Sequence, residues 1–426
     1  MAETVQMLLA LIDGGPEPET WQAARSVVKG EHEALVALVQ GGGDGYGVTT
    51  GVGHRDRDRL VDIAAFQGDL LASHLLPGLV WADRLQSRCI SLVKVHQLSR
   101  GGTGCSPEAF DAVVAAALDP DFAPPVPLDV TYSSGDVICG TWWAKGLLQH
   151  EHLDLGPKGA LSLINGSFVH LGVALALVPA LRSGVATTER VVRAALVAGR
   201  AKQSARYLGG MPEGAMADRL GQDPVAIRAA EDVLDTLRHA QDQFEAVLEE
   251  ELSRQSDNPL VAEGRLVEQA SFLAPRLALA TSALFDAWSL VGAWVDRAVT
   301  WLCYGAGGLA PDLADDERLG FIQVPKLVAA HVHRLRGLLS PRPFSAGGAT
   351  SHDIEDLWTH GVMMSSVLRS GLGVVHEMLA VLAVVVSRAV EIGAPAEASE
   401  ILGGSAGGTT LVERIERARP LLGWSV

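Results

Sequence analysis

Hydrophobic residues in this chain recur at intervals of three and four positions, with polar residues between them. From Ile227 to Leu248 this spacing places the apolar side chains on one face of a helix. The same periodicity continues in long apolar stretches at 168–182, 189–207, 273–303, 323–339 and 361–392. The alternation typical of a half-buried strand never extends far enough to predict a major sheet. The pattern therefore predicts a mainly α-helical protein.

Proline and the residues before it mark where two of these helices begin and end. Ser106 followed by Pro107 is typical of an N-cap with proline at the first helical position, which predicts a helix from Pro107 to about Leu118. The Asn258-Pro259 pair ends the periodic stretch that begins near Ile227.

Glycine and proline clusters separate the remaining stretches, at 41–53, 101–107, 120–127, 305–311, 341–348 and 403–408. No fixed-period repeat or low-complexity linker divides the chain. We therefore expect a long-helix bundle. Its loop-rich N-terminal part, over 1–200, carries the candidate site, and an extended helical bundle covers 201–426. The two parts are expected to form one continuous structural unit.

Composition and charge narrow the classes of function. Hydrophobic residues make up 48% and charged residues 20% of the 426 residues, which is the balance of a soluble globular protein. The formal net charge is −16. A chain this acidic repels nucleic acid and anionic membrane surfaces. We therefore expect neither a nucleic-acid partner nor a membrane partner.

The cysteines and the N-terminus bear on the compartment. Cys89, Cys105, Cys139 and Cys303 form no CxxC pair, and their spacing fits neither a zinc site nor a disulfide framework. They are expected to be buried small residues of a reducing compartment. Residues 1–12 lack the basic start and the small-residue cleavage site of a signal peptide. We expect a cytoplasmic protein without a metal site.

The most apolar run extends from Gly371 to Gly393. Polar residues interrupt it at His376, Glu377, Ser387 and Arg388. These interruptions favour a buried helix of a large bundle over a membrane span.

A Ser133-Ser134-Gly135-Asp136 sequence follows the proline-rich 124–127 segment. Alone, Ser-Ser-Gly indicates no more than a turn. Five other motifs accompany it: YGVTTGVG at 46–53, LLASH at 70–74, LGPKGALSLING at 155–166, QDPVAIR at 222–228 and SDNPL at 256–260. Together they resemble, in the same order and with similar spacing, the aromatic amino-acid ammonia-lyase family of histidine, phenylalanine and tyrosine ammonia-lyases and aminomutases. The resemblance extends from about Tyr46 to Gly361.

The resemblance implies a mainly α, long-helix bundle of the ammonia-lyase (fumarase/aspartase-like) type, and a prosthetic group made from the chain itself. In the family, the triad cyclises to 4-methylidene-imidazol-5-one, so no external cofactor is needed. Here the Gly135 nitrogen would attack the Ser133 carbonyl, and only glycine lets the backbone fold back that tightly. Ser134 loses its hydroxyl, while Ser133, which replaces the usual alanine, keeps its side chain as a spectator. The electrophile is needed because the β-hydrogen of an amino acid is weakly acidic and ammonium leaves poorly.

The family also implies roles for individual side chains. Tyr46 corresponds to the base that removes the β-proton, a role that requires a lowered pKa. Asn165 corresponds to the asparagine that contacts the ring and the substrate. Arg228 corresponds to the arginine that binds the substrate carboxylate through its forked donors. The structural alternatives are a loop aromatic at Tyr46, a buried amide at Asn165 and a surface arginine at Arg228.

Two positions bear on the substrate. Ser73-His74 in LLASH matches the histidine-specific branch, and Glu355 in SHDIEDLWTHG lies where that branch carries glutamate. A carboxylate at this position suits an imidazole or another basic donor on the substrate. The resemblance therefore implies a histidine-like or other polar α-amino acid. It also implies a homotetramer with shared active sites, in which Tyr46, Ser134 and Arg228 need not serve one site.

Several positions depart from the family pattern. Val225 replaces a tyrosine that reaches a neighbouring subunit's site, Tyr132 replaces the glycine before the triad, and Thr49 replaces an asparagine. Val137-Ile138-Cys139 stands for Leu-Ala-Pro, and the Asn-Phe segment expected at 269–272 reads Gln-Ala-Ser-Phe, so its asparagine and aromatic are displaced or lost.

These departures leave alternatives open for the reaction. One is an ammonia-lyase specialised for a different amino acid, and another is an aminomutase, which shares the same motifs. A third is a ring-free lyase or cyclase on the same scaffold that uses Tyr46, His74 and Glu355 as acid and base groups. The last is a non-catalytic homologue that acts through its helical surface.

Overall fold

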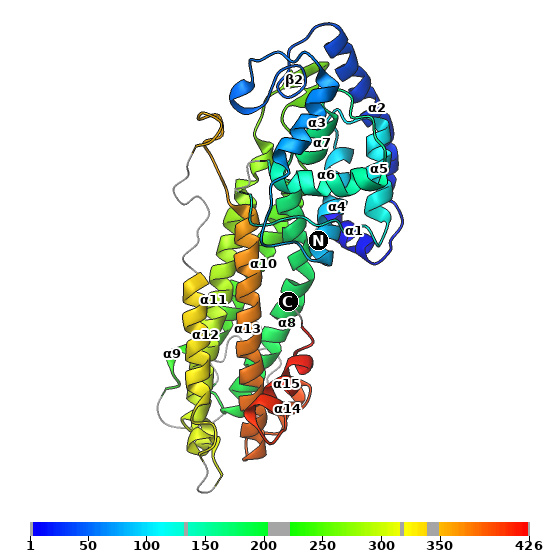
Figure 1. The fold of residues 1–426 in the computed structure, drawn as a ribbon. Helices are drawn as coiled ribbons and strands as arrows, with labels where there is room; N and C mark the ends of the chain where they lie inside the picture. The colour runs from blue at the N-terminus through cyan, green and yellow to red at the C-terminus, as the bar shows by residue number, and fades with distance from the viewer. Residues whose placement is uncertain (1–2, 132–134, 203–221, 316–318, 339–348, 425–426) are drawn as a thin grey trace. The chain divides into compact units, whose positions relative to one another are not determined.

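The computed structural model describes residues 3–131, 135–202, 222–315, 319–338 and 349–424. Helices dominate these residues (Figure 1). Within the described ranges, the strands are limited to β1 (Leu260–Ala262) and β2 (Arg265–Val267), an antiparallel pair with Val261 opposite Leu266. The predicted mainly α-helical class is confirmed.

The chain groups into two compact units. The first contains residues 1–177, 244–281 and 342–366, and the second contains 178–243, 282–341 and 367–426. Each unit is built from three separate segments. This grouping therefore divides the chain differently from the division at residue 200 that was expected from the sequence.

Helices of the first unit enclose α4 (Arg84–Ser99), whose residues 86–98 are buried. It packs against α1 (Glu3–Ile12), α2 (Glu19–Gln40) and α5 (Pro107–Leu118). A second group, α3 (Ile63–His74), α6 (Val137–His150) and α7 (Gly159–Ile164), packs together beside it. The short 3₁₀ helices η1 (Gly53–Arg55) and η2 (Ser271–Leu273) and the β1–β2 pair also belong to this unit.

The boundaries of α5 confirm the capping signal in the sequence. The Ser106 side chain accepts a hydrogen bond of 3.1 Å from the Ala109 amide, and Pro107 occupies the first turn. Proline suits this position because its missing N–H would have no helical partner there. The helix ends at Leu118, as predicted.

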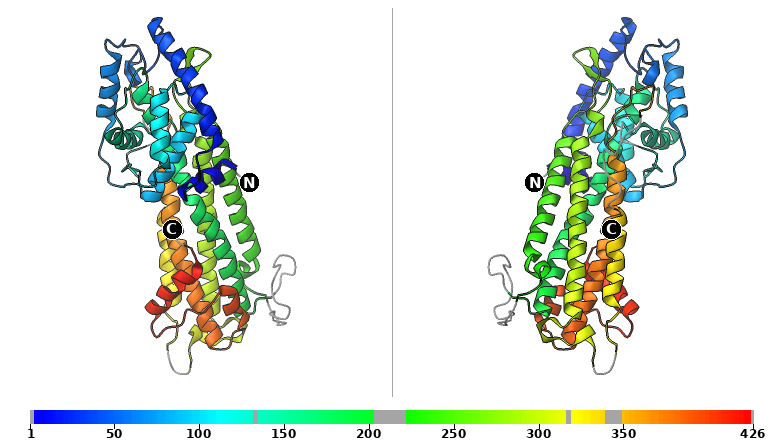
Figure 2. Two further views of the ribbon diagram at one scale, coloured as in Figure 1. Left: turned by 90° about the vertical axis from the view of Figure 1, so that its right-hand side faces the viewer. Right: turned by 90° about the vertical axis from the view of Figure 1, so that its left-hand side faces the viewer.

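The second unit contains long helices that run side by side (Figure 1, Figure 2). They are the C-terminal part of α8 (Phe168–Ala198), most of α10 (Ala230–Leu252), most of α11 (Pro275–Cys303), α12 (Val324–Leu338) and most of α13 (Gly361–Glu391). The shorter helices α9 (Val225–Arg228), α14 (Glu397–Leu402) and α15 (Leu411–Leu422) belong to the same unit. Two short 3₁₀ helices, η3 (Ala306–Gly308) and η4 (Pro311–Leu313), follow α11. Trp288 and Trp424 stack here with ring centroids 5.4 Å apart, directly over Gly184.

One helix, α8, joins two stretches that the sequence pattern separated. The helix tolerates its polar middle because the Ser183 and Thr188 hydroxyls donate hydrogen bonds to the carbonyls four residues earlier, at 2.9 and 2.8 Å, and so have partners within the helix. The helix ends at Ala198, earlier than residue 207, because Arg200 adopts a left-handed φ of 48°.

Three segments are long and apolar enough to cross a membrane by length and composition: Gly159–Ala198, Ser271–Cys303 and Gly361–Glu391. In their most apolar stretches, 100%, 61% and 78% of the residues are buried within the structure. Neighbouring protein therefore already covers most of this apolar surface, as it does for the core helices of a large bundle.

Candidate active site

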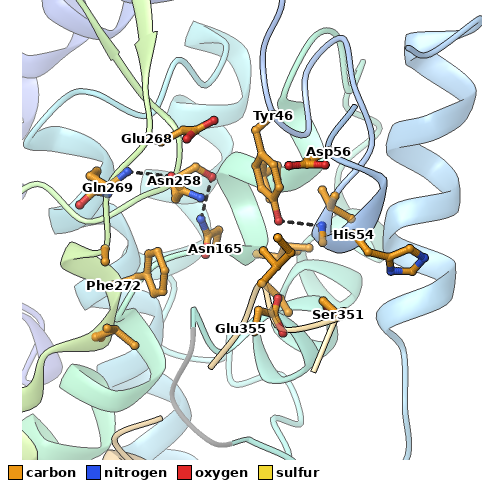
Figure 3. Close-up of a pocket in the computed structure, with 18 of the residues that line it drawn as sticks. Tyr46, His54, Asp56, Asn165, Asn258, Glu268, Gln269, Phe272, Ser351 and Glu355 are labelled. Atoms are coloured by element: carbon orange, nitrogen blue, oxygen red, sulfur yellow. Dashed lines mark hydrogen bonds between the residues drawn. The ribbon is translucent and has the colours of Figure 1, made fainter. Parts of the chain in front are cut away.

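The first unit contains a cavity of about 610 Å³. Its wall is formed by the loop after α2, the C-terminal half of α3, the ends of α6 and α7, the segment after β2 and the loop before α13. Figure 3 shows Tyr46, Asn165 and Glu355 around this space. Residues far apart in the sequence thus meet at one site.

Tyr46 lies in a glycine-rich loop that rests on α7. A Cβ atom on Gly47, whose φ is +64°, would lie 2.6 Å from the Leu161 side chain, so only glycine permits this approach. The Tyr46 hydroxyl accepts a hydrogen bond of 2.9 Å from the Gly53 amide. The local sequence YGVTTGVG therefore fixes the direction of the phenol.

The pKa of Tyr46 is raised above its ordinary value. Burial is the main cause, and the hydrogen bond from Gly53 acts in the opposite direction. The nearby carboxylates of Glu355, Asp56 and Glu268 raise the pKa further. A base at this position requires a lowered pKa, so the surroundings within one chain work against that role.

Asn165 follows the last residue of α7, and hydrogen bonds fix its orientation. Its Nδ2 donates to Asp257 Oδ1 at 2.8 Å and to the Asn258 carbonyl at 3.1 Å. Its backbone carbonyl accepts hydrogen bonds from Lys94 Nζ at 3.0 Å and from Gln97 Nε2 at 3.2 Å. These bonds leave Oδ1 as the side-chain atom directed away from Asp257.

Gly135 lies directly against this oxygen. A Cβ atom at Gly135 would be 2.5 Å from Asn165 Oδ1, and the φ of Gly135 is +81°. Only glycine therefore fits at this position without displacing Asn165. The other two members of the triad, Ser133 and Ser134, lie outside the described residues.

Charged side chains are buried behind Asn165. Lys158 donates to the Asp257 carboxylate and, at 2.8 Å, to the Thr103 carbonyl, and both members of the ion pair are fully buried. Lys94 is also fully buried and lies 4.3 Å from the centroid of the Phe168 ring. Burial lowers the pKa of Lys94 to about 7. This cluster holds the main chain and the amide of Asn165 in place.

His74 lines the cavity from the end of α3. Its Nδ1 lies 2.8 Å from the Leu70 carbonyl. A carbonyl can only accept, so Nδ1 carries a proton in this contact. In the neutral ring, Nε2 is then the atom that accepts a hydrogen bond.

Glu355 lines the cavity from the loop before α13. A backbone pair between Thr350 and Glu355 closes this loop, and the Thr350 hydroxyl donates to the Glu355 carboxylate at 2.9 Å. The loop and the Tyr46 loop meet, because Gly53 lies against Ser351. His54 and His352 stack at the same contact, with ring centroids 4.1 Å apart.

Arg228 belongs to the second unit and does not line the cavity. It is the last residue of the four-residue helix α9, where its Nε donates to the Asp223 carbonyl at 3.0 Å. Its side chain is exposed, and Val225, at the first position of α9, is 70% exposed. Of the anticipated side chains, the structure thus brings Tyr46, His74, Asn165 and Glu355 together, and places Arg228 elsewhere.

Comparison with known proteins gives the family. The family model for aromatic amino acid lyases matches residues 4–147 and 189–416. The chain belongs to the aromatic amino acid lyase family. It is therefore a carbon–nitrogen lyase, consistent with the order of the motifs in its sequence.

Individual relatives agree with this family. A probable histidine ammonia-lyase of Halobacterium salinarum is 28% identical over 387 residues, covering 75% of this chain and 73% of that protein. Ergothionase of Treponema denticola, an ergothioneine-degrading enzyme, superposes with a TM-score of 0.84 at 18% identity, covering 94% of this chain and 93% of that one. Phenylalanine aminomutase of Pantoea agglomerans gives 0.84 at 17%, covering 99% and 97%. The solved structures establish the helical ammonia-lyase fold.

Several wall residues of this lyase were not anticipated from its sequence. Gln269 and Phe272 line the cavity, so this part of the wall carries an amide and an aromatic side chain although the family's Asn-Phe pair is missing. His54, Asp56 and Glu268 also line it. The described lining residues include the carboxylates of Asp56, Glu268 and Glu355 but no lysine or arginine, so the wall is acidic.

The buried charges were missed for different reasons. Lys158 and Asp257 lie inside the LGPKGALSLING and SDNPL motifs, so those motifs could have indicated them. Lys94 stands between Val93 and Val95, and no motif marks it. Within the described part of the chain, no group of three or more His, Cys, Asp or Glu side chains is arranged to hold a metal ion.

Proposed function

We propose that this lyase eliminates ammonia from a histidine-like or other polar α-amino acid, using 4-methylidene-imidazol-5-one formed from Ser133-Ser134-Gly135. The observation that carries the proposal is the meeting of Tyr46, His74, Asn165 and Glu355 around one cavity. Their polar groups come from four separate parts of the chain, which a purely structural arrangement does not require.

The surroundings of Gly135 fit the prosthetic group. Ring formation needs glycine at the third position, and Asn165 Oδ1 occupies the space that any side chain there would fill. Asn165 is itself held by Asp257 and by Lys94. When formed, the ring supplies an electrophile that makes loss of ammonia feasible.

The acidic wall suits a substrate with positive charge. Glu355 can accept a hydrogen bond from an imidazole or an ammonium group, and His74 can accept another through Nε2. Tyr46 can accept the β-proton once a cation near its oxygen lowers its pKa. The substrate ammonium group is one such cation, and it would offset the three carboxylates that act on Tyr46.

In this proposal, a neighbouring subunit supplies the group that binds the substrate carboxylate. We propose a cytoplasmic homotetramer with shared active sites, which binds neither nucleic acid nor membrane. The exposed Arg228 side chain would bind the substrate carboxylate at the site of another subunit. Its hydrogen bond to the Asp223 carbonyl orients the guanidinium in advance.

Ammonia release from L-histidine tests the proposed reaction. The wild-type protein is expected to release ammonia and the α,β-unsaturated acid in equal amounts. Glu355→Gln should raise KM more than it lowers kcat, because the amide removes the negative charge but keeps an acceptor. Release from neither L-histidine nor a panel of polar α-amino acids would contradict the proposal.

A ring-free reaction on the same scaffold is the second candidate. The raised pKa of Tyr46 favours it, because a protonated phenol is suited to donate a proton rather than to remove one. In this case Tyr46, His74 and Glu355 act as acid and base groups for an elimination or a cyclisation. Ser134→Ala separates the candidates: the ring mechanism requires loss of activity, whereas the ring-free mechanism requires activity to remain.

An aminomutase reaction uses the same proposed prosthetic group and differs in its product. The chain shares its fold with a phenylalanine aminomutase. Product analysis decides between them, because an aminomutase returns the amino group as a β-amino acid, whereas the proposed lyase accumulates the unsaturated acid and free ammonia.

A further inference from the structure

Gln67 lies outside the cavity but between two of its walls. It is fully buried on α3, on the same helix face as Leu70 and His74, which line the cavity. A buried carboxamide needs hydrogen-bond partners for both its oxygen and its nitrogen. Both kinds of partner are backbone groups of other segments that hold proposed site residues.

The oxygen of Gln67 caps the start of α7. It accepts hydrogen bonds from the amides of Ala160 at 2.9 Å and Leu161 at 3.4 Å. The first amides of a helix have no partner inside the helix, and Lys158, the N-cap residue, provides no side-chain cap. Gln67 therefore provides this cap from another helix, and α7 in turn leads directly to Asn165.

The nitrogen of Gln67 holds the Tyr46 loop. Nε2 donates at 3.3 Å to the carbonyl of Gly47, the residue that follows Tyr46. The same Gly47 rests on Leu161 of α7. One carboxamide thus links the loop that carries Tyr46 to the helix that ends at Asn165.

We propose that Gln67 is a positioning residue that sets the placement of Tyr46 relative to Asn165. Its catalytic consequence rests on the proposed function, since it assumes that both side chains act on one substrate. The linkage itself depends only on the three hydrogen bonds. Misplacement of a reacting group by about an ångström lowers the rate by roughly a hundredfold.

Gln67→Glu separates the two halves of the linkage, because it replaces only NH₂ by oxygen. The ionised carboxylate still accepts hydrogen bonds from the α7 amides, and its negative charge suits a helix N-terminus. It can no longer donate to the Gly47 carbonyl. At low pH the protonated carboxyl regains a donor, so the contact with the Tyr46 loop is restored.

Hydrogen exchange of the intact protein, followed by mass spectrometry, tests the linkage without a substrate. At about pH 8, residues 45–55 of Gln67→Glu should exchange about tenfold faster than in wild type, the effect of one lost hydrogen bond. Residues 159–165 should stay protected. Burial raises the pKa of a glutamate carboxyl above its ordinary value of about 4.3, so at about pH 5, after correction for intrinsic exchange, the difference should largely disappear.

Gln86→Glu is the matched control. Gln86 is also buried, and its oxygen accepts from the Asp83 amide in a capping box, where glutamate serves equally well. Unchanged exchange at 45–55 in folded Gln67→Glu, or the same change in Gln86→Glu, overturns the proposal. If circular dichroism shows Gln67→Glu unfolded, Gln67→Met replaces it: faster exchange in both segments supports the linkage, and unchanged exchange at 45–55 overturns it.

Kinetics give a second readout. In protein that releases ammonia from L-histidine, Gln67→Glu should lower kcat about tenfold or more while KM stays within about twofold, and the deficit should shrink at low pH. Wild-type protein without this activity contradicts the proposed function, and the exchange measurement still decides the role of Gln67. A change in KM alone overturns the catalytic part of the proposal.

Discussion

Gly135 and Asn165 lie so close together that any side chain at position 135 would displace Asn165. Gly135→Ala would place a methyl group 2.5 Å from Asn165 Oδ1, closer than the two atoms can approach, and would force alanine into a left-handed φ. We expect the ring not to form in this variant. Its mass should then equal the full encoded mass, without the loss of two waters, and it should release no ammonia. Gly156→Ala is the control, because nothing lies within 4 Å of its added carbon. Loss of both waters by Gly135→Ala would show that this contact is unimportant.

The buried amine of Lys94 predicts a dependence of stability on pH. Asp257, Cys105 and Lys158 are the charged or titratable groups that act on it, and burial lowers its pKa from 10.5 to about 7. Between these values the unfolded chain binds the extra proton, so the free energy of unfolding rises with pH. Below about pH 7, the folded protein carries the full cost of a buried charge.

Urea denaturation of wild type and Lys94→Met measures this effect. Methionine is one atom shorter than lysine, keeps an unbranched apolar side chain and removes the charge. We expect the wild-type protein to gain stability relative to the variant as the pH rises from about 7 to about 10. The lost hydrogen bond to Asn165 adds only a constant offset. A stability difference that does not change with pH would contradict the account.

Sequence reasoning at the residue scale pointed to polar residues that the structure brings together, and their catalytic roles stay predictions. Tyr46, His74, Asn165 and Glu355 do meet around one cavity. It failed for Lys94, because a lysine between two valines gives no signal of its partners. It also failed for the acidity around Tyr46, since Asp56, Glu268 and Glu355 come from separate loops whose meeting depends on the fold.

Elements with their own local signals were predicted best. The N-cap at Ser106 placed α5 correctly, and the apolar face of α10 includes the buried Leu237, Phe244 and Leu248. The start of this helix was less accurate, because a break at Ala229 separates α9 from α10. No periodicity marks such a break, since the apolar residues of α9 and α10 keep helical spacing across it.

Close helix approach makes a prediction at the scale of elements. A Cβ atom on Gly172 of α8 would lie 2.6 Å from Ile90 Cα of α4 and 2.8 Å from its amide nitrogen. Backbone atoms cannot move aside as a side chain can, so Gly172→Ala should lower the free energy of unfolding by about 1–3 kcal/mol.

Gly373→Ala on α13 is the matched control. Nothing lies within 4 Å of its added carbon, and alanine favours the helix by about 0.5–1 kcal/mol, so this variant should be neutral or more stable. Thermal unfolding of both variants measures the contrast. Equal stability of the two variants would contradict the close packing of α8 on α4.

The whole molecule makes a prediction through Arg228, which belongs to the second unit and does not line the cavity. If the sites are shared between subunits, Tyr46→Phe and Arg228→Ala damage different chains of one site. Mixing the two inactive proteins, with unfolding and joint refolding, should recover about a quarter of the wild-type activity by random assembly. The activity of each variant refolded alone is the control. No recovery in a mixed oligomer confirmed by light scattering would contradict shared sites.

The family itself was predictable because ordered motifs extend over most of the chain, and the family model confirms it over 4–147 and 189–416. The identity of the substrate was not. Specificity depends on side chains such as Gln269 and Phe272, whose place in the wall follows from how the β2 segment packs against the cavity. Sequence spacing alone does not determine that packing.

The mass of the intact wild-type chain tests the central claim most directly. Ring formation from Ser133-Ser134-Gly135 removes two waters, so the active protein should weigh two water masses less than its encoded sequence. Ser134→Ala should have the full encoded mass of that variant and no ammonia-lyase activity. Active wild-type protein at the full encoded mass would contradict the account.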